Sequence, residues 1–382
     1  MALWPAHPKP LNDELLSSWL VRLAAANSQK LHTFSKVAWP EVELWNRDVD
    51  RLAPEDVLRV VSERTGTPVT RVREATLGAF AGRLFEKHSP NGSAAWLLPL
   101  GVFHRIRRNY GLQYCPVCLA EEPPYYRRIW RLAFVTICPR HDVMLRDRCP
   151  TCNAPINFHR GERGDRNLRT AEAAMTRCYA CNEDLIVEPE KAHHTREMAE
   201  LAIAQQKWLD ALFRGYIDLG DGTVVYSHLF FVGLHILFQN FASGESGEAL
   251  RARICRDPGW SPRWSDKVHA IERLDVLDRF ELAYVVSRVL SDWPDLFVAT
   301  GRAAKVVASD LMGRLLSVPF WYFRVVDEHF QSGTYSPTLP EIGNAIQYLR
   351  RRNEKVTKTS VSRVLGLGDV MRKRGLHWML DG

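Results

Sequence analysis

Apolar side chains recur every three or four residues along most of the chain, which is the period of an amphipathic helix. The first such stretch contains Leu15, Leu16, Trp19, Leu20 and Leu23. Asn12 or Asp13 is the expected N-terminal cap of this helix. A second predicted helix occupies residues 54–66, between a proline and a glycine, and a third begins after Pro68. Two helices joined by a short glycine-containing turn outline a helix-turn-helix unit, although a corner of any helical bundle has the same outline.

Helical spacing returns in the second half of the chain. Its clearest positions are Trp208, Leu209, Leu212, Phe213 and Tyr216, and then Leu274, Leu277, Phe280, Leu282, Val285 and Leu290. The longest apolar run, residues 229–238, is interrupted by Gly233 and His235. It is shorter than the roughly 18–20 residues that a membrane span needs, so we expect a buried helix. The aromatic run 320–323 is expected in a core or an interface, and a helix should end at Trp293, before a proline.

The C-terminal segment is basic and has a pattern of its own. An amphipathic helix is predicted over residues 339–352, followed by a turn and a short helix over 359–365 with Gly366 as its C-terminal cap. Short polar and cationic side chains at the start of a helix suit phosphate and base contacts. The candidate DNA contacts in this second helix-turn-helix-like unit are Lys358, Thr359 and Arg363.

Between these helical parts, cysteine dominates the pattern. Seven of the 8 cysteines lie between positions 115 and 181. With one histidine they form four pairs, each with two intervening residues: Cys115 and Cys118, Cys138 and His141, Cys149 and Cys152, and Cys178 and Cys181. This spacing lets a tight turn present two ligands to one tetrahedral ion. Four such pairs predict two structural zinc ions, and because all eight ligands are used, no position remains for a catalytic water.

Other interpretations of the cysteines fit less well. Disulfides do not suit a chain expected in the cytoplasm or a histidine that completes the pattern, and a redox Cys-x-x-Cys would not come in four copies. Sequential pairing gives one site with three cysteines and a histidine and one all-cysteine site. Interleaved pairing would resemble a RING ubiquitin ligase, an enzyme, but residues 142–148 form a longer spacer than RING domains have. Sequential pairing is therefore our prediction. Cys255 stands alone and is interpreted as an inert thiol.

Arginine and aromatic residues alternate between the first two ligand pairs, in residues 125–132. We expect this segment to meet a partner through Arg127, Arg128 and Arg131. The composition of residues 134–137 predicts a β-strand that leads into the second ligand pair. The basic stretch 159–169 is expected to be an exposed loop.

Composition and charge bear on the class of protein. The chain of 382 residues is 46% hydrophobic and 25% charged, which argues against wholesale disorder. Its net charge of +7 favours polyanionic partners. Arginine triplets with aromatic neighbours, at 105–108, 127–131 and 350–352, point the same way. No secretory signal, phosphate-binding loop, dinucleotide fingerprint, nucleophile motif or carboxylate cluster is evident, which indicates a cytoplasmic binding protein that is not an enzyme.

The predicted fold is therefore mainly α with a small zinc-stabilised module. A helical, helix-turn-helix-like domain covers residues 1–110, and tandem zinc knuckles or ribbons cover 111–190. A helical domain covers 191–330, and the basic helix-turn-helix-like segment covers 331–382.

Three motifs resemble the TniQ family, which includes the TnsD-type target selectors of bacterial transposons. Residues 8–22 read Pro-Lys-Pro-Leu-Asn-Asp-Glu-Leu-Leu-Ser-Ser-Trp-Leu-Val-Arg, similar to the family's N-terminal signature of proline, then Glu-Ser-Leu, a hydrophobic residue, and Ser-Trp-Leu-x-Arg. Residues 114–118 with 125–131 resemble its first zinc knuckle and Trp-Arg segment. Residues 138–152 resemble its Cys-x-x-His, Leu, Cys-x-x-Cys core.

The resemblance covers residues 8 to about 185 and implies target-site selection without catalysis. Family members link a DNA-targeting complex, in some cases an RNA-guided CRISPR effector, to an AAA+ regulator that recruits the transposase. The implied partners are the AAA+ regulator, such an effector with its guide RNA, DNA, and a second copy in a head-to-tail dimer; a membrane is not among them. The implied location is the bacterial cytoplasm, at the nucleoid during targeting. The alternative is a selector that reads an attachment site directly.

Overall fold

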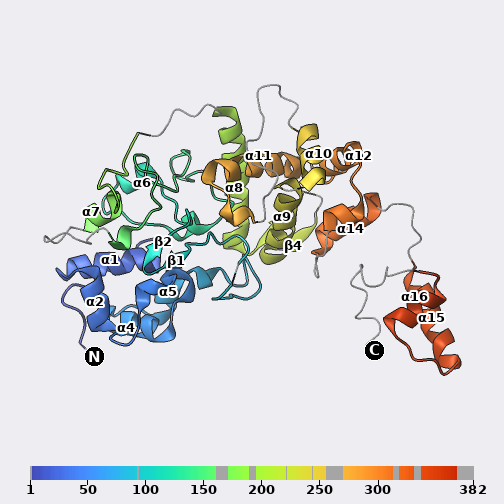
Figure 1. Cartoon of the computed structure of the whole chain (residues 1–382), viewed down its shortest axis with the longest axis horizontal. Helices are drawn as coiled ribbons and strands as arrows, with labels where there is room; N and C mark the ends of the chain where they lie inside the picture. The colour runs from blue at the N-terminus through green and yellow to red at the C-terminus, as the bar shows by residue number, and fades with distance from the viewer. Residues whose placement is uncertain are drawn as a thin grey trace. The chain divides into compact units, whose positions relative to one another are not determined.

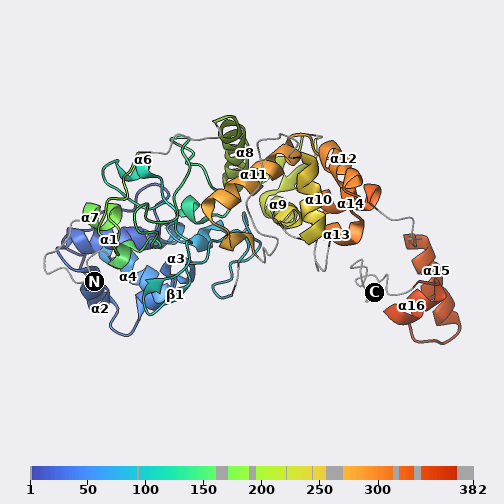
Figure 2. The ribbon, with the colours of Figure 1, turned by 45° about the horizontal axis from the view of Figure 1, so that its top comes forward.

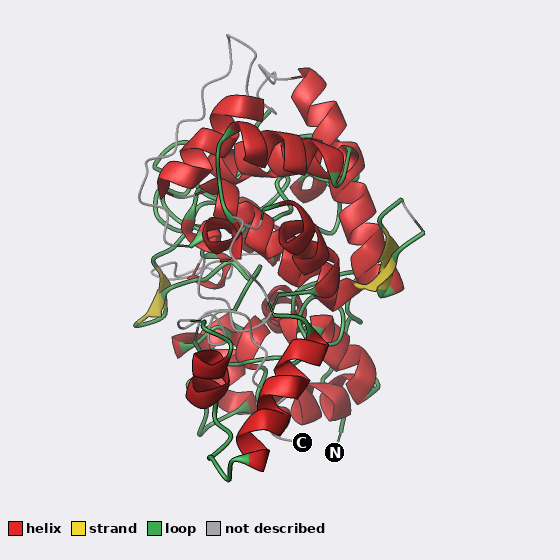
Figure 3. Cartoon of the chain, turned by 90° about the vertical axis from the view of Figure 1, so that its right-hand side faces the viewer, coloured by secondary structure: helices red, strands yellow, loops and turns green. Residues whose placement is uncertain are grey.

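The computed structural model describes residues 2–92, 94–160, 171–188, 195–220, 222–242, 244–254, 270–312, 318–330 and 337–367. The described residues are mostly helical, as predicted, and their paired strands form two short antiparallel hairpins (Figure 3). The chain separates into two compact units, Met1–Trp293 and Pro294–Gly382. No described helix is long and apolar enough to cross a membrane.

The N-terminal helices lie together (Figure 1). They are α1 Leu16–Ala26, α2 Leu31–Ala38, α3 Val49–Leu52, α4 Glu55–Thr65 and α5 Val69–Glu74. The predicted bounds of α4 are confirmed, because Pro54 caps its start and Gly66, with φ 61°, ends it. The cap predicted for α1 is wrong. Leu15 occupies that position and makes no side-chain cap bond, while Asp13 accepts hydrogen bonds from the backbone N–H of Ile129 and from the side chain of Arg128.

The segment before α1 is fastened by side chains of the helix itself. Glu14 and Arg22 form a buried ion pair of 2.7 Å, and the Ser18 hydroxyl donates to Glu14. The indole N–H of Trp19 donates to the Pro8 carbonyl at 2.7 Å, and Arg22 donates to the Lys9 carbonyl at 2.9 Å. The proline, glutamate, serine, tryptophan and arginine positions noted in residues 8–22 therefore fold the N-terminus onto α1.

The region between the N-terminal helices and α8 is mostly irregular. Its short elements are β1 Val102–Phe103, β2 Ile106–Arg107, α6 Pro116–Leu119 and α7 Ala171–Thr176. The N-terminal half also contains 3-10 turns, at Leu44–Asn46, Leu77–Phe80, Arg128–Arg131 and Phe158–Arg160. The exposed loop expected over 159–169 is corrected at its start, because His159 is 4% and Arg160 7% exposed. Residues 161–170 lie outside the described part.

The β-strand predicted over residues 134–137 is wrong. The segment is buried, but it pairs with another backbone only through an isolated bridge between Ile137 and Met144. On its other side Gln205 accepts from the N–H groups of Thr136 and Ile137 at 2.8 and 3.1 Å and donates to the Ile137 carbonyl at 2.8 Å. A glutamine amide with one donor and one acceptor side can replace a neighbouring strand in this way.

The helical part of the first unit comprises α8 Thr195–Arg214, α9 Ser227–Ala242, α10 Gly244–Ile254 and α11 Val276–Ser291, with a 3-10 turn at Ile271–Arg273. Both views show α8 beside α11 (Figures 1 and 2), and the two helices are in contact. β3 Tyr216–Asp218 pairs with β4 Val224–Tyr226. The predicted helical face from Trp208 is confirmed in part. Trp208 and Leu212 are buried, whereas Phe213 is 46% exposed.

Helix α9 is the buried helix expected from the apolar run 229–238. Aromatic rings from α9 and from the irregular region form the core beside it: the ring centroids of Trp96 and Phe238 are 5.0 Å apart, and those of Phe134 and Phe231 are 5.1 Å apart. The histidine that interrupts the apolar run, His235, lies 2.8 Å from Glu272. A polar position in an apolar helix is thus accommodated by a charged partner.

The second unit contains α12 Asp295–Ala303, α13 Ala308–Met312, α14 Phe320–His329, α15 Leu339–Arg351 and α16 Lys358–Val364. In the aromatic run 320–323, Trp321 and Tyr322 are buried and Phe320 is 51% exposed. The predicted C-terminal helix pair is present, and Thr338 and Thr357 each begin a helix with a capping box. Its core consists of Ile342, Ala345, Leu349 and Val361, with Ile346, Val356 and Leu365 packed against them.

Candidate metal centres

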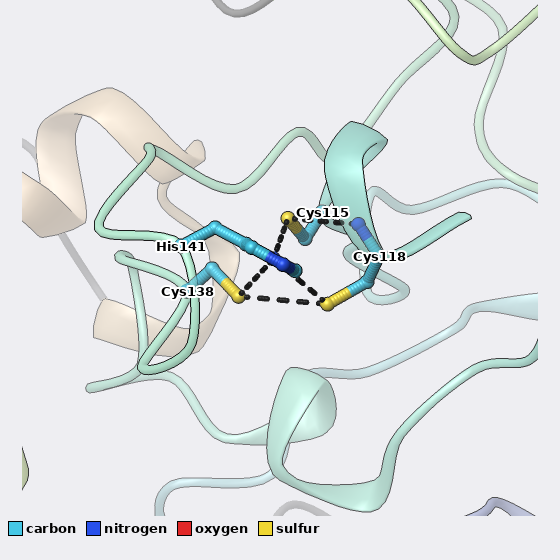
Figure 4. A group of neighbouring side chains, drawn as sticks. All are labelled: Cys115, Cys118, Cys138 and His141. Carbon is cyan, nitrogen blue, oxygen red and sulfur yellow. Dashed lines mark hydrogen bonds between the residues drawn. The ribbon is translucent and has the colours of Figure 1, made fainter. Parts of the chain in front are cut away.

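Four side chains converge on one point in the first cluster (Figure 4). Cys115 caps the short helix α6, Cys118 lies within it, and Cys138 and His141 come from the turn that follows residues 134–137. The Nδ1 atom of His141 lies 3.5, 3.3 and 3.6 Å from the sulfur atoms of Cys115, Cys118 and Cys138. The three cysteines are buried and His141 is half-buried.

The separations match a tetrahedral zinc site. Zn–S bonds of about 2.3 Å and Zn–N bonds of about 2.0–2.1 Å place two sulfur atoms about 3.8 Å apart, and sulfur and nitrogen about 3.6 Å apart. The Sγ atoms of Cys118 and Cys138 are separated by 3.7 Å. The residues present therefore fit a zinc ion without any rearrangement, and Nδ1 would be the histidine ligand atom.

The second cluster joins the third and fourth pairs. The Sγ atoms of Cys149 and Cys181 are 3.6 Å apart, as are those of Cys152 and Cys178. All four ligand atoms lie within 4.8 Å of one another. The structure thus brings the eight expected ligands together in sequential pairs, and not in the interleaved arrangement. Four protein ligands in each cluster leave no open coordination position, which is the pattern of structural sites.

Three of the four ligand pairs form the same knuckle. The residue after each second ligand has a left-handed backbone: φ is 49° at Asp142, 59° at Asn153 and 66° at Asn182. In each case its N–H donates back to the carbonyl of the first ligand, at a distance of 3.0 Å. Aspartate and asparagine tolerate this conformation better than other residues with a side chain. Their position after each ligand pair is a sequence signal for the knuckle that our sequence analysis did not use.

Glu121 supports the histidine from outside the cluster. Its Oε1 lies 3.2 Å from Nε2 of His141, on the side of the ring that faces away from the sulfur atoms. A carboxylate that accepts the second ring N–H fixes the tautomer with a lone pair on Nδ1 and orients the ring toward a metal. Arg140 in turn holds Glu121 at 2.6 Å. Sequence reasoning missed Glu121, since it lies 20 residues from His141 and in no ligand motif.

Replacing Glu121 with glutamine is expected to weaken zinc binding at the first cluster about tenfold, because the imidazole loses its charged partner. Competition against a chromophoric chelator measures this affinity. Glu122→Gln makes the same chemical change at an exposed neighbouring position and should leave the affinity unchanged. Equal affinities for the two variants would show that Glu121 does not support the metal ligand.

The three cysteine sulfur atoms of the first cluster lie so close together that they can all be thiolates only if a cation neutralises them. Hydrogen bonds with the Cys115 and Cys138 thiols lower the pKa of Cys118 to about 2. The corresponding hydrogen bonds to Cys118 and Cys138 raise the pKa of Cys115 well above its ordinary value. Three thiolates at these distances repel one another, and a divalent ion removes that penalty.

The placement of Arg131 corrects the expectation that it meets a partner. Its side chain is 1% exposed and lies 2.6 Å from Asp48 and 3.5 Å from Asp50. It also donates to the Leu98 carbonyl at 2.8 Å. Asp50 in turn accepts from the N–H and the hydroxyl of Ser17. Arg131 therefore ties α1 and α3 to the segment between the first two ligand pairs.

Arg127 and Arg128 are also engaged within the chain. Arg128 pairs with Asp13 at 3.0 Å, and its side chain is 14% exposed. Arg127 is 7% exposed, and its guanidinium lies 4.5 Å from the centre of the Tyr125 ring. Most of the aromatic and arginine residues of 125–131 are used for packing, and a partner contact through Arg127 and Arg128 stays a prediction.

The C-terminal candidates have a different environment. Lys358, Thr359 and Arg363 are exposed on α16, and Arg363 pairs with Glu354 at 2.9 Å. They belong to the second compact unit, whereas both metal clusters belong to the first. Cys255 lies outside the described residues.

Comparison with known families assigns the N-terminal part of the chain. Residues 5–145 match the TniQ family model. This part of the chain is a TniQ domain. A search of curated proteins found no match. A TniQ domain implies a role related to target selection in transposition.

The residues of the TniQ domain correspond to identifiable parts of the structure. They include the Glu14–Arg22 pair, the buried Arg131 and the whole first cluster, which ends at His141. The match stops before Cys149, so the second cluster and the helices from α8 onward lie beyond it.

Proposed function

We propose that this TniQ protein is a target-selection adaptor in DNA transposition. It connects a complex that is bound at the target DNA to an AAA+ regulator, which brings the transposase to that site. The match over residues 5–145 carries the proposal. The chain's own role is to bind and position these partners, so it needs no catalytic centre.

The two clusters support this role as structural zinc sites. Each has four protein ligands at distances suited to zinc, and each holds a region with little regular structure. Zinc binding contributes directly to the folding free energy of such regions. The first cluster shapes the segment between the N-terminal helices and α8, and the metal there provides a rigid surface and no chemistry.

The proposal has two forms, which differ in what recognises the target DNA. An adaptor that docks on an RNA-guided complex takes its site from the guide RNA. A direct selector reads DNA itself. The exposed Lys358 and Thr359 at the start of α16 and the exposed Arg363 in its last turn favour this second form. We propose the adaptor as the main function and direct reading as the alternative.

A transposition assay tests the proposal. The chain is expressed together with a transposase, an AAA+ regulator and a donor element, and the insertions are mapped by sequencing. We expect clustered insertions with the chain present, and lost or scattered insertions without it. An unchanged insertion pattern without the chain would refute the proposed function.

Charge reversal on α16 decides between the two forms. In an adaptor, Lys358→Glu with Arg363→Glu should leave the insertion site unchanged. In a direct selector it should abolish the clustering, since two cations at a DNA-contacting helix become anions. Arg302→Glu with Lys305→Glu makes an equal charge change at exposed positions of the same compact unit and is the control.

A further inference from the structure

The β1–β2 hairpin has a strained tip. His104 and Arg105 form its two-residue turn, and both have positive φ, 46° and 65°. A two-residue hairpin turn with this backbone strongly prefers Asn-Gly or a similar pair, because other side chains are strained there. Strain of this kind persists only where the surrounding structure enforces it, and it concentrates at functional sites.

The surrounding structure does fix this hairpin. Arg107, on β2, is 3% exposed, and its backbone N–H donates to Asn157 at 3.2 Å. The Arg105 carbonyl lies 3.0 Å from Nε2 of the buried His159. At the base, the N–H of Arg108 donates to the Leu100 carbonyl at 3.1 Å. The arginine triplet 105–108 is therefore divided: Arg107 is an anchor, and the other two point outward.

The outward side chains form a small cationic and aromatic tip, made of Phe103, His104, Arg105 and Arg108. All four are exposed, and Phe103 keeps 50% of its surface. The Arg108 guanidinium lies 4.0 Å above the Phe103 ring, and within the described part of the chain it has no carboxylate partner. Arg105 pairs with Glu43, but the two side chains are 47% and 54% exposed. Exposed pairs of this kind are weak, so a phosphate can compete for Arg105.

The charged residues that flank the tip in the sequence are all basic. Residues 87–120 contain no aspartate or glutamate, while they contain Lys87, Arg105, Arg107 and Arg108. A rigid hairpin with two outward guanidinium groups and one exposed ring is suited to a polyanion with a regular backbone. Arginine holds phosphate oxygens through paired hydrogen bonds, and preorganisation reduces the entropy lost on binding.

We propose that this tip contacts the phosphate backbone of duplex DNA. Arg105 and Arg108 each bind one phosphate, and Phe103 packs against the adjoining sugar. The inference rests on the proposed function only in that a target selector works at DNA. It places a DNA contact in the first compact unit, apart from α16 in the second.

Salt dependence of DNA binding tests the proposal. The affinity of the full-length, zinc-loaded chain for a fluorescent duplex is measured by anisotropy over a series of salt concentrations. Each phosphate contact contributes about −0.9 to the slope of log affinity against log salt. Arg105→Ala with Arg108→Ala should therefore reduce the steepness by about 1.8 and weaken binding about 60-fold at 0.1 M salt. Arg105→Lys with Arg108→Lys keeps both charges and should retain the slope.

Arg59→Ala with Arg71→Ala is the matched control. These arginines, on α4 and α5, are 54% and 48% exposed and are paired with carboxylates, so their removal should leave the slope unchanged. An unchanged slope in the hairpin variant would overturn the proposal. So would an equal loss in the control variant, or a loss confined to single-stranded DNA or RNA.

Failure of this inference is distinguishable from failure of the proposed function. If the insertion site depends on the chain but the hairpin variant binds duplex with the wild-type slope, only the hairpin proposal is overturned. If the hairpin variant loses the slope but insertions do not depend on the chain, only the proposed function is overturned. Unchanged zinc content in the variant establishes that the fold is retained.

Discussion

Replacing Cys149 with serine is expected to release one of the two zinc ions and to unfold the region around the second cluster. A neutral hydroxyl is a poor zinc ligand, and the three remaining thiolates hold the ion far less tightly. Structural zinc sites in small domains contribute about 10–16 kcal/mol of apparent binding free energy at neutral pH, which exceeds the stability of most domains. Metal analysis should therefore find one equivalent of zinc, with a lower melting temperature.

Cys255→Ser is the matched control, because Cys255 belongs to neither ligand set, and it should retain both ions. Unchanged zinc content in Cys149→Ser would contradict the assignment. Pairing is tested by Cys115→Ser combined with Cys138→Ser. If the pairs are sequential, both changes affect one site and one ion remains. If they were interleaved, each change would affect a different site and no ion would remain.

Replacing Arg131 with methionine is expected to destabilise the first compact unit by about 3–5 kcal/mol, the usual result of removing one partner from a buried charge cluster. The fully buried Asp50 and the largely buried Asp48 would lose the guanidinium that pairs with both of them. Chemical denaturation followed by fluorescence measures this loss. Arg71→Met, which removes an exposed pair with Glu74, should change the stability little. A small effect at Arg131 would mean that water reaches the cluster.

The pH dependence follows from the same contact. Burial raises the pKa of Asp48, but the charge and hydrogen bonds of Arg131, together with the charges of Arg107 and Arg51, outweigh burial and hold this pKa below its ordinary value. A carboxyl group whose pKa is lower in the folded state than in the unfolded state stabilises the fold at pH values above the unfolded-state pKa of about 3.9. This stabilisation is lost as the pH falls through the folded-state pKa. The difference in the free energy of unfolding between the wild type and Arg131→Met should therefore become smaller below about pH 4.

The metal centres could be predicted from the sequence because their information is local. Two residues between ligands define a knuckle, and eight ligands in order define two sites. Helix α4 could also be predicted from the sequence, because a proline and a glycine mark its two ends. Such signals act within a few residues and do not depend on what the rest of the chain does.

What the sequence did not reveal depends on contacts between distant residues. Residues 134–137 have the composition of a strand, but their partner is Gln205, far along the chain. Arg131 has the sequence context of a surface arginine, but Asp48 and Asp50 enclose it. Neither partner lies near its counterpart in sequence, and local propensity does not specify tertiary contacts.

The hydrogen bonds that Gln205 makes with residues 136 and 137 bear on where this chain can be divided into fragments. Arg279 on α11 makes a similar contact, since it donates to the carbonyl of Ala133 at 2.9 Å. A fragment that ends at residue 145, where the family match ends, would lack both side chains. Without α8 and α11, the apolar side chains that pack against them would also be exposed to water, among them Phe134, whose ring centroid lies 6.2 Å from that of Trp208 on α8. We therefore expect a stable fragment of this chain to extend through α11, past the residue at which the family match ends.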